Sequence, residues 1–228
     1  MPIKACIFDA YGTLFDVSAA AREAAAAPEN EMIAENWERL AFDWRRKQLE
    51  YSWLRAITGA HRDFWRVTQD GLDWALDAQG LRDPDLRERL LALYWRLSPY
   101  PEVPEVLARL QRSGIATAIL SNGSPDMLDA AVRSAGIEAL LDDVLSVERV
   151  GIFKPAREVY SLATTRFGCA PGEVLFVSSN GWDIDGAGGF GFFTAWVNRT
   201  GEPQDRLDHP PHEELRDLAL IPDIAAAI

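Results

Sequence analysis

The sequence predicts an α/β protein in which a doubly wound parallel sheet is interrupted by an inserted helical block. From Pro101 onward, short apolar runs typical of buried strands alternate with helical patterns, which indicates a parallel sheet with helices on both faces. One more apolar run, residues 3–8, stands at the front of the chain. The segment between them, residues 18–97, reads as almost wholly helical. We therefore expect the first strand to join the later sheet, with the helical segment inserted after it.

Each later element is predicted from its local pattern. Apolar runs predict further strands at 116–120, 144–147, 174–177 and 192–197. Helical patterns between these runs predict helices at 125–134 and 156–167. A chain of 228 residues suits one large domain or a domain with a smaller insertion. Because folding of such a chain buries roughly 70% of the surface of its unfolded form, it needs no disulfide or metal to stay folded.

Charge and cysteine content narrow the partners and the compartment. The net charge of −12 disfavours nucleic acid and anionic membranes as partners. No apolar stretch approaches the roughly 20 residues that span a bilayer. Residues 1–4 run directly into the first strand, so we expect no secretory signal. Cys6 and Cys169 have no metal-ligand spacing, and a reduced, cytoplasmic compartment is the economical prediction.

Polar side chains follow four of the expected strands, namely Asp9, Ser121–Gly123, Lys154 (after a short connection) and Ser178–Asp183. In a doubly wound sheet, ligands bind beyond the carboxyl ends of the strands. Any one of these residues alone is more simply an ordinary cap or turn residue. Their coincidence at four strand ends predicts one shared site.

Several segments resemble the L-2-haloacid dehalogenases of the haloacid dehalogenase superfamily: FDAYGTLFDV (8–17), WRRKQLEYSWLR (44–55), LSNGSP (120–125), KPAREVY (154–160) and FVSSNGWD (176–183). The strand-end aspartate alone is typical of the whole superfamily, whereas WRRKQLEY and SSNGWD are far more specific. The resemblance spans nearly the entire chain. It implies a Rossmann-like core of residues 1–15 and 98–228 and a helical cap of residues 16–97.

This resemblance also implies an activity. Such an enzyme converts short L-2-haloalkanoic acids to D-2-hydroxy acids, with water as second substrate and with neither a metal nor another cofactor. The nucleophile forms an aspartyl ester and inverts C2 of the substrate. Members of the family are often homodimers, which the sequence of this chain leaves open.

The motif around the first strand departs from that of the phosphatases in the same superfamily. Phosphatases carry a second aspartate that protonates the leaving alkoxide, and further acidic residues that hold Mg²⁺. Here the second aspartate is replaced by Tyr11, a poor acid at neutral pH, and Ser179 and Asn180 stand where metal-binding carboxylates often occur. Because a halide leaves without protonation, these differences favour cleavage of a carbon–halogen bond.

The resemblance assigns a role to each candidate residue. Asp9 is the nucleophile, Thr13 orients it and Lys154 balances its charge. The hydrolytic water is oriented and deprotonated by Ser178, Asn180 and Asp183 with Tyr160, although Asp183 could instead merely pair with Lys154. The substrate and the halide are contacted by Ala10, Tyr11, Arg45, Leu49, Phe64, Ser121, Asn122 and Trp182. Of these, Leu49, Phe64 and Trp182 are expected to form an apolar pocket.

Two adjacent arginines are predicted to differ. A helix turns by about 100° per residue, which places on one apolar stripe Trp37, Leu40, Trp44 and Tyr51. Arg46 points away from this stripe and is expected to be a solvated surface charge. Arg45 lies on its flank and aligns with the family's substrate- and halide-handling arginine, although an ordinary salt bridge would also explain it.

Three other functions stay open from the sequence. One is a magnesium-dependent phosphatase that uses Asp9 and Asp183. Another is a metal-free hydrolase that opens a strained ring beside a carboxylate. The third is an inactive binding module, in which the convergence of Asp9, Lys154 and Asp183 would have no use. The three histidines are too scattered to suggest a metal site.

Overall fold

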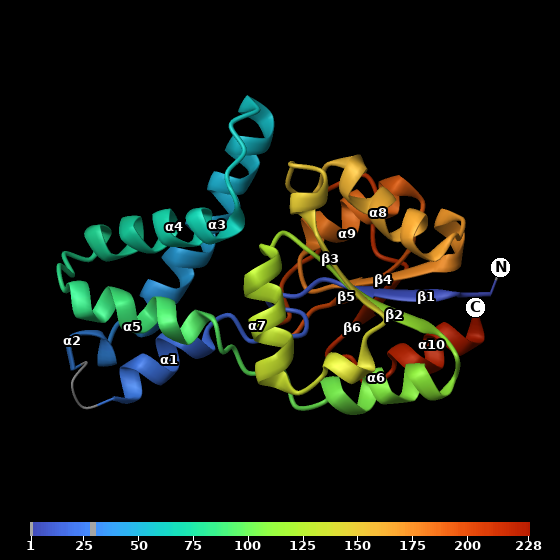
Figure 1. Cartoon of the computed structure of the whole chain (residues 1–228), viewed down its shortest axis with the longest axis horizontal. Coiled ribbons are helices and arrows are strands. Elements are labelled where there is room, and N and C mark those ends of the chain that lie inside the picture. The colour runs from blue at the N-terminus through green and yellow to red at the C-terminus, as the bar shows by residue number, and fades with distance from the viewer. Residues whose placement is uncertain (1, 28–30) are drawn as a thin grey trace.

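The computed structural model describes residues 2–27 and 31–228. In this part of the chain, one parallel sheet of six strands has the order β3-β2-β1-β4-β5-β6 (Figure 1). The strands are β1 (Ala5–Phe8), β2 (Ala116–Ser121), β3 (Asp143–Ser146), β4 (Val174–Ser178), β5 (Phe193–Val197) and β6 (Glu213–Leu215). The predicted α/β class with a parallel sheet is confirmed. Residue 1 of the expected core and residues 28–30 of the expected cap lie outside the described residues.

β1 occupies the centre of the sheet. All of its residues are buried, as expected for a continuous apolar run in a parallel sheet. Its first residue, Ala5, aligns with Ala116 of β2 on one side and with Val174 of β4 on the other. The strand order reverses between β1 and β4, so the ligand crevice of a doubly wound sheet lies beyond the carboxyl ends of these two strands.

Helices cover both faces of the sheet (Figure 1). α6 (Val103–Arg112), α7 (Pro125–Ala135) and α10 (Ile221–Ala227) lie on one face. α8 (Arg157–Phe167) and α9 (Gly181–Phe190) pack together on the other. The expected helices 125–134 and 156–167 therefore agree with α7 and α8 to within one residue at each end.

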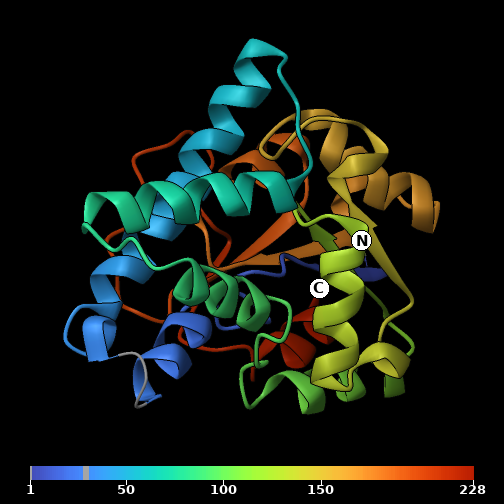
Figure 2. The ribbon, with the colours of Figure 1, turned by 60° about the vertical axis from the view of Figure 1, so that its left-hand side comes forward.

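The segment between β1 and α6 is helical, as predicted. Its helices are α1 (Ala19–Ala26), α2 (Glu31–Ala34), α3 (Trp37–Thr58), α4 (Phe64–Ala78) and α5 (Pro84–Tyr94). α3 packs along α4, and α1 packs against α3 and α5. Gly59 caps the end of α3, and its φ of 67° is the left-handed conformation that glycine favours at helix ends. Figures 1 and 2 show this helical block beyond the carboxyl ends of the strands.

The two connections between the sheet and the helical block run side by side. The backbone N–H of Asp16 donates to Ser98 O at 3.0 Å, and that of Tyr100 donates to Leu14 O at 2.9 Å. Phe15 forms a β-bridge with Pro99. These contacts lie at the expected boundaries of the core and the cap, and the division into two domains stays a prediction.

Three differences from the expected elements have local causes. β1 begins at Ala5 rather than at residue 3, and the expected strand 144–147 is shifted by one residue because Val147 begins a 3₁₀ turn, Val147–Arg149. β6 was not predicted, because its sequence Glu-Glu-Leu is short and mostly exposed.

Among the described residues, no helix is both long and apolar enough to cross a membrane.

Candidate active site

Asp9 is the first residue beyond β1 at the centre of the sheet. Its backbone N–H donates to Val177 O at 2.9 Å, which continues the pairing of β1 with β4 by one residue. Its side chain is buried. The following turn needs Gly12, whose φ is +91° and where a Cβ would come within 3.0 Å of Ser179 Oγ. The sequence after β1 therefore folds into a tight turn. This turn fixes the Asp9 carboxylate beyond the carboxyl ends of β1 and β4, where the strand order of the sheet reverses.

Three side chains donate hydrogen bonds to the Asp9 carboxylate. Lys154 Nζ lies 3.1 Å from Oδ1. Thr13 Oγ1 and Asn180 Nδ2 both donate to Oδ2, each at 3.1 Å. Because these donors engage both oxygens, they restrict the rotation of the carboxyl group. The structure therefore presents Asp9 as an oriented carboxylate.

Lys154 is a fully buried cation between two carboxylates. Its Nζ donates to Asp9 Oδ1 and, at 2.8 Å, to Asp183 Oδ2. Burial lowers the pKa of Lys154, but the charges of Asp183 and Asp9 outweigh it, so that its pKa lies above the ordinary value. Asn122 Oδ1 accepts a hydrogen bond from the backbone N–H of Lys154 at 2.9 Å, which holds the lysine loop against the end of β2. The lysine is therefore charged and fixed in position.

Asp183 is fully buried at the start of α9. Its Oδ1 accepts from Tyr160 Oη at 2.8 Å, and its Oδ2 accepts from Ser178 Oγ at 3.0 Å in addition to Lys154. Burial raises the pKa of Asp183, and the nearby charge of Asp9 raises it further, against the opposite effects of Lys154 and Tyr160. Burial also raises the pKa of Tyr160 well above its ordinary value, so the phenol stays a donor. The site thus pairs two carboxylates with one buried lysine.

Arg45 reaches this cluster from α3. Its Nη2 donates to Tyr11 O at 3.2 Å and to Asn180 Oδ1 at 3.3 Å. Both acceptors are neutral, and no carboxylate among the described residues forms an ion pair with Arg45. The ordinary salt bridge is therefore not what the structure shows. A guanidinium whose acceptors in the described part of the chain are neutral, beside a buried carboxylate cluster, is suited to binding an anion.

The expectation for Arg46 needs correction, because this side chain is not simply solvated. It is partly exposed and forms ion pairs with Asp43 at 3.1 Å and Glu50 at 3.4 Å. Its guanidinium also lies 4.8 Å from the ring centre of Trp74 in α4. The physical reason is that α4 packs along α3, which covers a face that an isolated helix would expose. Among the described residues, none of these contacts of Arg46 is with Asp9 or its donors.

Tyr11 is packed among aromatic rings. Its ring stacks on Phe64 and Tyr94, with ring centres 5.8 and 5.7 Å away. Burial raises the pKa of Tyr11 well above its ordinary value, so it is an even weaker acid than an exposed tyrosine. Its buried hydroxyl has no hydrogen-bond partner among the described residues.

Within the same residues, no group of three or more His, Cys, Asp or Glu side chains is arranged to hold a metal ion.

The remaining predicted residues lie around the cluster rather than in one pocket. Ser121 is buried and its Oγ accepts from Gly123 N at 3.1 Å, while Ala10 is buried directly after Asp9. Trp182 packs edge-on against Trp53 at 5.5 Å.

Leu49 and Trp182 line two different hollows of the described surface, and the apolar pocket expected from Leu49, Phe64 and Trp182 stays a prediction. Phe64 packs on Tyr11. Leu49 lines a separate surface hollow beside Arg45, because the helical period places these two residues on one face of α3.

Two groups near the site were missed by sequence reasoning. The backbone N–H of Ser179 donates to Thr13 Oγ1 at 2.8 Å, which fixes the hydroxyl that donates to Asp9. Ser179 lies inside the FVSSNGWD segment, so that motif carried the signal. Tyr94, at the end of α5, stacks on Tyr11. Nothing local in the sequence of α5 marks Tyr94, because the contact depends on how the helical block meets the sheet.

Comparison with known proteins gives the class that this fold and site define. Residues 3–191 match the family model described as haloacid dehalogenase-like hydrolase. (S)-2-haloacid dehalogenase 1 of Pseudomonas sp. (strain CBS-3) is 44% identical over 224 residues, which cover 98% of this chain and 96% of the relative.

Solved structures agree with the sequence relatives. A crystal structure of a dehalogenase with intermediate complex superposes with a TM-score of 0.93 at 39% identity, covering 98% of this chain and 97% of that chain. The structure of L-2-haloacid dehalogenase from Xanthobacter autotrophicus with chloropropionic acid covalently bound has a TM-score of 0.87 at 38% identity, covering 97% and 98% of the two chains. The chain belongs to the (S)-2-haloacid dehalogenase family of the haloacid dehalogenase-like hydrolases.

Proposed function

We propose that this protein is a hydrolytic dehalogenase that converts short L-2-haloalkanoic acids to D-2-hydroxy acids. One observation carries the proposal: a buried carboxylate, Asp9, is held through both oxygens with Lys154 3.1 Å away, while the position of a phosphatase's second acid is occupied by Tyr11. An oriented carboxylate can attack carbon, and a halide needs no proton to leave. The relative with covalently bound chloropropionic acid supports the same chemistry.

In the first step, an Asp9 oxygen attacks C2 of the substrate from the side opposite the halogen. The new C–O bond forms as the carbon–halogen bond breaks, the halide leaves with the electron pair, and C2 is inverted. Arg45, Ser121 and Asn122 bind the substrate carboxylate and the departing halide. The hydroxyl of Tyr11, which has no hydrogen-bond partner among the described residues, supplies one more donor for the halide.

In the second step, water attacks the carbonyl carbon of the aspartyl ester, which restores Asp9 and releases the D-2-hydroxy acid. Asp183 accepts the proton of this water, and Tyr160, Ser178 and Lys154 hold the Asp183 carboxylate in place. Asn180 Nδ2, 3.1 Å from Asp9 Oδ2, positions the ester. In the alternative role, Asp183 serves only as the partner that keeps Lys154 charged.

The helical block acts as a cap in this proposal. Residues 16–97 form the cap, and residues 1–15 with 98–228 form the core. Arg45 belongs to the cap, and its charged side chain reaches the site in the core. A closed cap excludes bulk water, which strengthens the interactions between charges at the site. The two cysteines are unpaired, in agreement with a reduced, cytoplasmic compartment. A homodimer is compatible with the family.

The proposal is tested by halide release from L- and D-2-chloropropionate, with and without a metal chelator. We expect release from the L enantiomer only, at the same rate in both buffers. A strict requirement for Mg²⁺ together with phosphate release from phosphomonoesters would favour the phosphatase. Turnover of a strained-ring carboxylate without halide release would favour the ring-opening hydrolase. Equal rates on both enantiomers would contradict the stereochemistry of the proposal.

A further inference from the structure

Arg199 lies shortly after β5 and reaches the turn that follows Asp9. Its Nη2 donates to the backbone oxygen of Thr13 at 3.0 Å, and its Nη1 forms an ion pair with Glu102 at 2.7 Å. The guanidinium also lies 3.6 Å from the ring centre of Tyr100. One side chain therefore contacts the turn after β1, the second connection to the helical block and the start of α6.

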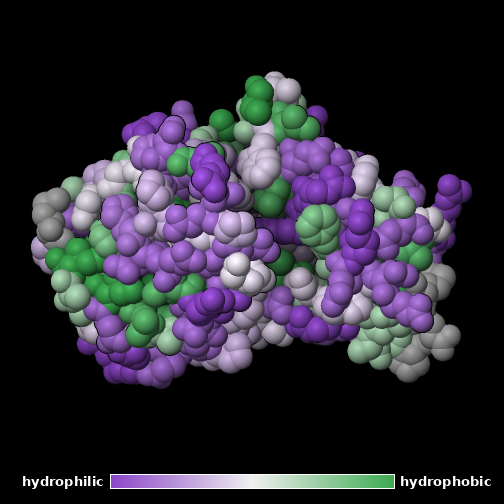
Figure 3. All heavy atoms as spheres, turned by 180° about the vertical axis from the view of Figure 1, so that it is seen from behind, coloured by the Kyte–Doolittle hydropathy of each residue, from purple (hydrophilic) through white to green (hydrophobic). Residues whose placement is uncertain are grey.

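This guanidinium is largely enclosed by the protein. The side chain of Arg199 is 18% exposed, and its buried Nε has no hydrogen-bond partner in the described part of the chain. The connections beside it join the core to the helical block, and Figure 3 shows that the surface is hollowed between these two parts. Arg199 thus ties the connections to the core.

The hydroxyl of Thr13 has two acceptors at nearly equal distances. Its Oγ1 lies 3.1 Å from Asp9 Oδ2 and 3.2 Å from Ser179 Oγ. A hydroxyl carries a single proton, so it can donate to only one of these oxygens at a time. A small shift of Thr13 therefore decides whether the nucleophile keeps this donor. Arg199 holds the backbone oxygen of the same residue.

A second side chain of β5 holds the other residue in this arrangement. The Nε1 of Trp196 donates to Ser179 O at 3.1 Å. The backbone N–H of Ser179 in turn donates to Thr13 Oγ1 at 2.8 Å, which leaves the hydroxyl proton free to point at a carboxylate. The end of β5 and the residues just after it thus support both Thr13 and Ser179.

We propose that Arg199 is a positioning residue for the nucleophile: it holds the carbonyl of Thr13 and thereby directs the Thr13 hydroxyl to Asp9. The inference rests on the proposed dehalogenase function and adds a residue to it. Among the described residues, the side chain of Arg199 donates to Thr13 and Glu102 alone, and neither binds the substrate in the proposed mechanism. The rate of attack by Asp9, and not substrate binding, therefore depends on Arg199.

Arg199→Met tests this role, because it removes the donors and keeps an unbranched chain over the ring of Tyr100. The first-turnover burst of halide from L-2-chloropropionate should be about tenfold slower, since a loosened nucleophile spends less time in line with the carbon. The dissociation constant of the unreactive propionate, measured by calorimetry, should stay within about twofold of the wild type. Arg199→Lys keeps the charge beside Glu102, and should also slow the burst while it retains more stability in urea.

Glu102→Gln is the matched control. It removes the ion pair but leaves the hydrogen bond from Arg199 to Thr13, so it should lower stability in urea while the burst keeps its rate. Burst rates of the Arg199 variants that match the rate of Glu102→Gln would overturn the inference, because the ion pair alone would then explain the effect.

A double-mutant cycle shows whether Arg199 acts through the Thr13 hydroxyl. Thr13→Val removes that hydroxyl and keeps the shape of the side chain. In this background Arg199→Met should slow the burst no further, because the group that it positions is absent. A full tenfold effect in the Thr13→Val background, about the same as in the wild type, would mean that Arg199 does not act through Thr13.

Hydrogen exchange of the Ser179 amide, followed by NMR, separates this inference from the proposed function. Because Thr13 Oγ1 accepts from this amide, its exchange should be about tenfold faster in Arg199→Met and unchanged in Glu102→Gln. If this holds while no 2-haloacid releases halide, the positioning by Arg199 is supported and the dehalogenase function fails. If chloropropionate is turned over but Arg199→Met and Glu102→Gln agree in burst rate and in exchange, the function stands and the inference is overturned.

Discussion

Asp9 combines burial with full orientation at the level of a single residue. Both of its oxygens accept hydrogen bonds, from Lys154, Thr13 and Asn180, so the carboxylate has little freedom to rotate. A nucleophile held in this way loses little entropy when it reaches the reacting carbon. The same donors would stabilise the carbonyl oxygen of an aspartyl ester when water attacks it.

A single turnover in ¹⁸O-water tests the nucleophilic role of Asp9. We expect the product hydroxyl of the first turnover to carry unlabelled oxygen from the aspartate, while the label enters the Asp9 side chain. The reason is that water attacks the ester at the carboxyl carbon of Asp9 and not at C2. Mass analysis of the product and of the peptide containing Asp9 provides the measurement, with enzyme in excess.

Asp9→Asn is the matched control, since it keeps the shape of the side chain and should release no halide. Label in the first-turnover product with an unlabelled Asp9 peptide would mean that water attacks C2 directly, and the covalent mechanism would be wrong.

A second prediction about single residues concerns the adjacent arginines Arg45 and Arg46. Arg45→Ala should lower kcat/KM on the order of 100-fold, because an anion-binding donor is lost, with near-wild-type stability. Arg46→Ala should keep kcat/KM within about twofold and lower the free energy of unfolding by about 1 kcal/mol, since Asp43 and Glu50 lose a partner. Steady-state kinetics and urea unfolding of both variants provide the measurement. Similar kinetics for the two variants would contradict the assigned faces of α3.

Two helices cooperate on Asp183 at the scale of elements. α9 carries Asp183 in its first turn, and α8 places Tyr160 so that its hydroxyl donates to Oδ1 at 2.8 Å. The ring of Tyr160 packs against Phe176 of β4, which fixes the distance between the helix and the strand end. A change in one hydroxyl of α8 should therefore act on a carboxylate of α9.

Tyr160→Phe tests whether Asp183 is the base that activates water. The hydrogen bond from Tyr160 lowers the pKa of Asp183, against burial, which raises it. Without the hydroxyl the pKa rises further, and the ionised base is lost at a higher pH. The acid limb of the kcat profile should therefore move to higher pH, while the first-turnover burst of halide keeps its rate. The measurement is a pH–rate profile with rapid-quench halide detection.

An unmoved acid limb would contradict the basic role of Asp183 and favour its role as the partner of Lys154. Phenylalanine keeps the ring contacts with Phe176 and so serves as its own packing control.

In the whole molecule, two adjacent chain connections and the side chain of Arg45 join the helical block to the sheet core.

Acidic residues with depressed pKa values stabilise both parts. Burial raises the pKa of Asp43 in α3, but hydrogen bonds from Arg39 and Arg46 outweigh it and lower that pKa. Burial likewise raises the pKa of Asp143 in β3, and Arg166 with its other donors lowers it below the ordinary value.

The double variant Asp43→Asn, Asp143→Asn tests this whole-molecule dependence. Because both folded pKa values lie below the unfolded value of 3.8, their stabilisation is present above that pH and is lost as the pH falls through the folded values. The variant should be less stable than the wild type at about pH 6, and the difference should shrink at about pH 3. Urea unfolding at both pH values provides the measurement. A difference that stays constant with pH would contradict the assignment.

The sequence by itself determined the features that depend on short stretches of chain. Continuous apolar runs defined β1, β2, β4 and β5 to within a few residues, because a strand buried on both faces needs apolar side chains along its whole length. The same reasoning placed Asp9 and Asp183 just after strands, and Lys154 after a short connection from another strand. Parallel strands bring those ends to one edge, so the convergence of the site could be predicted before any contact was known.

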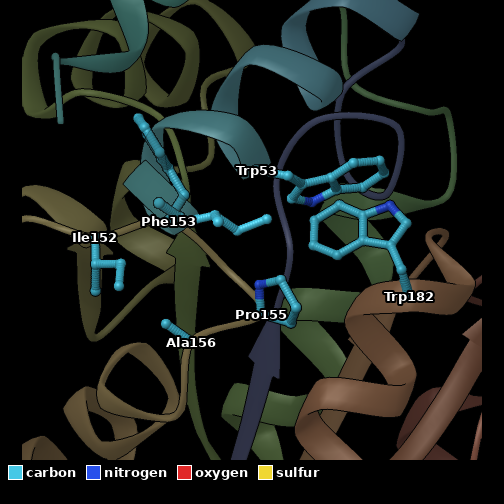
Figure 4. Close-up of a pocket in the computed structure, with 8 residues that line it drawn as sticks. Trp53, Ile152, Phe153, Pro155, Ala156 and Trp182 are labelled. Atoms are coloured by element: carbon cyan, nitrogen blue, oxygen red, sulfur yellow. The ribbon is translucent and has the colours of Figure 1, made fainter. Parts of the chain in front are cut away.

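Only the tertiary structure decided which surfaces meet. β6 is a strand only because β5 pairs with it, and its own sequence carries no pattern. The guanidinium of Arg46 lies against the ring of Trp74 because α4 packs against α3. Tyr94 contacts Tyr11 because α5 ends beside the turn that follows β1. The apolar hollow lined by Trp53 and Trp182 (Figure 4) exists because α3 ends against the core. Periodicity reports how much of a segment is buried, whereas the angle and distance at which two elements pack depend on every side chain between them.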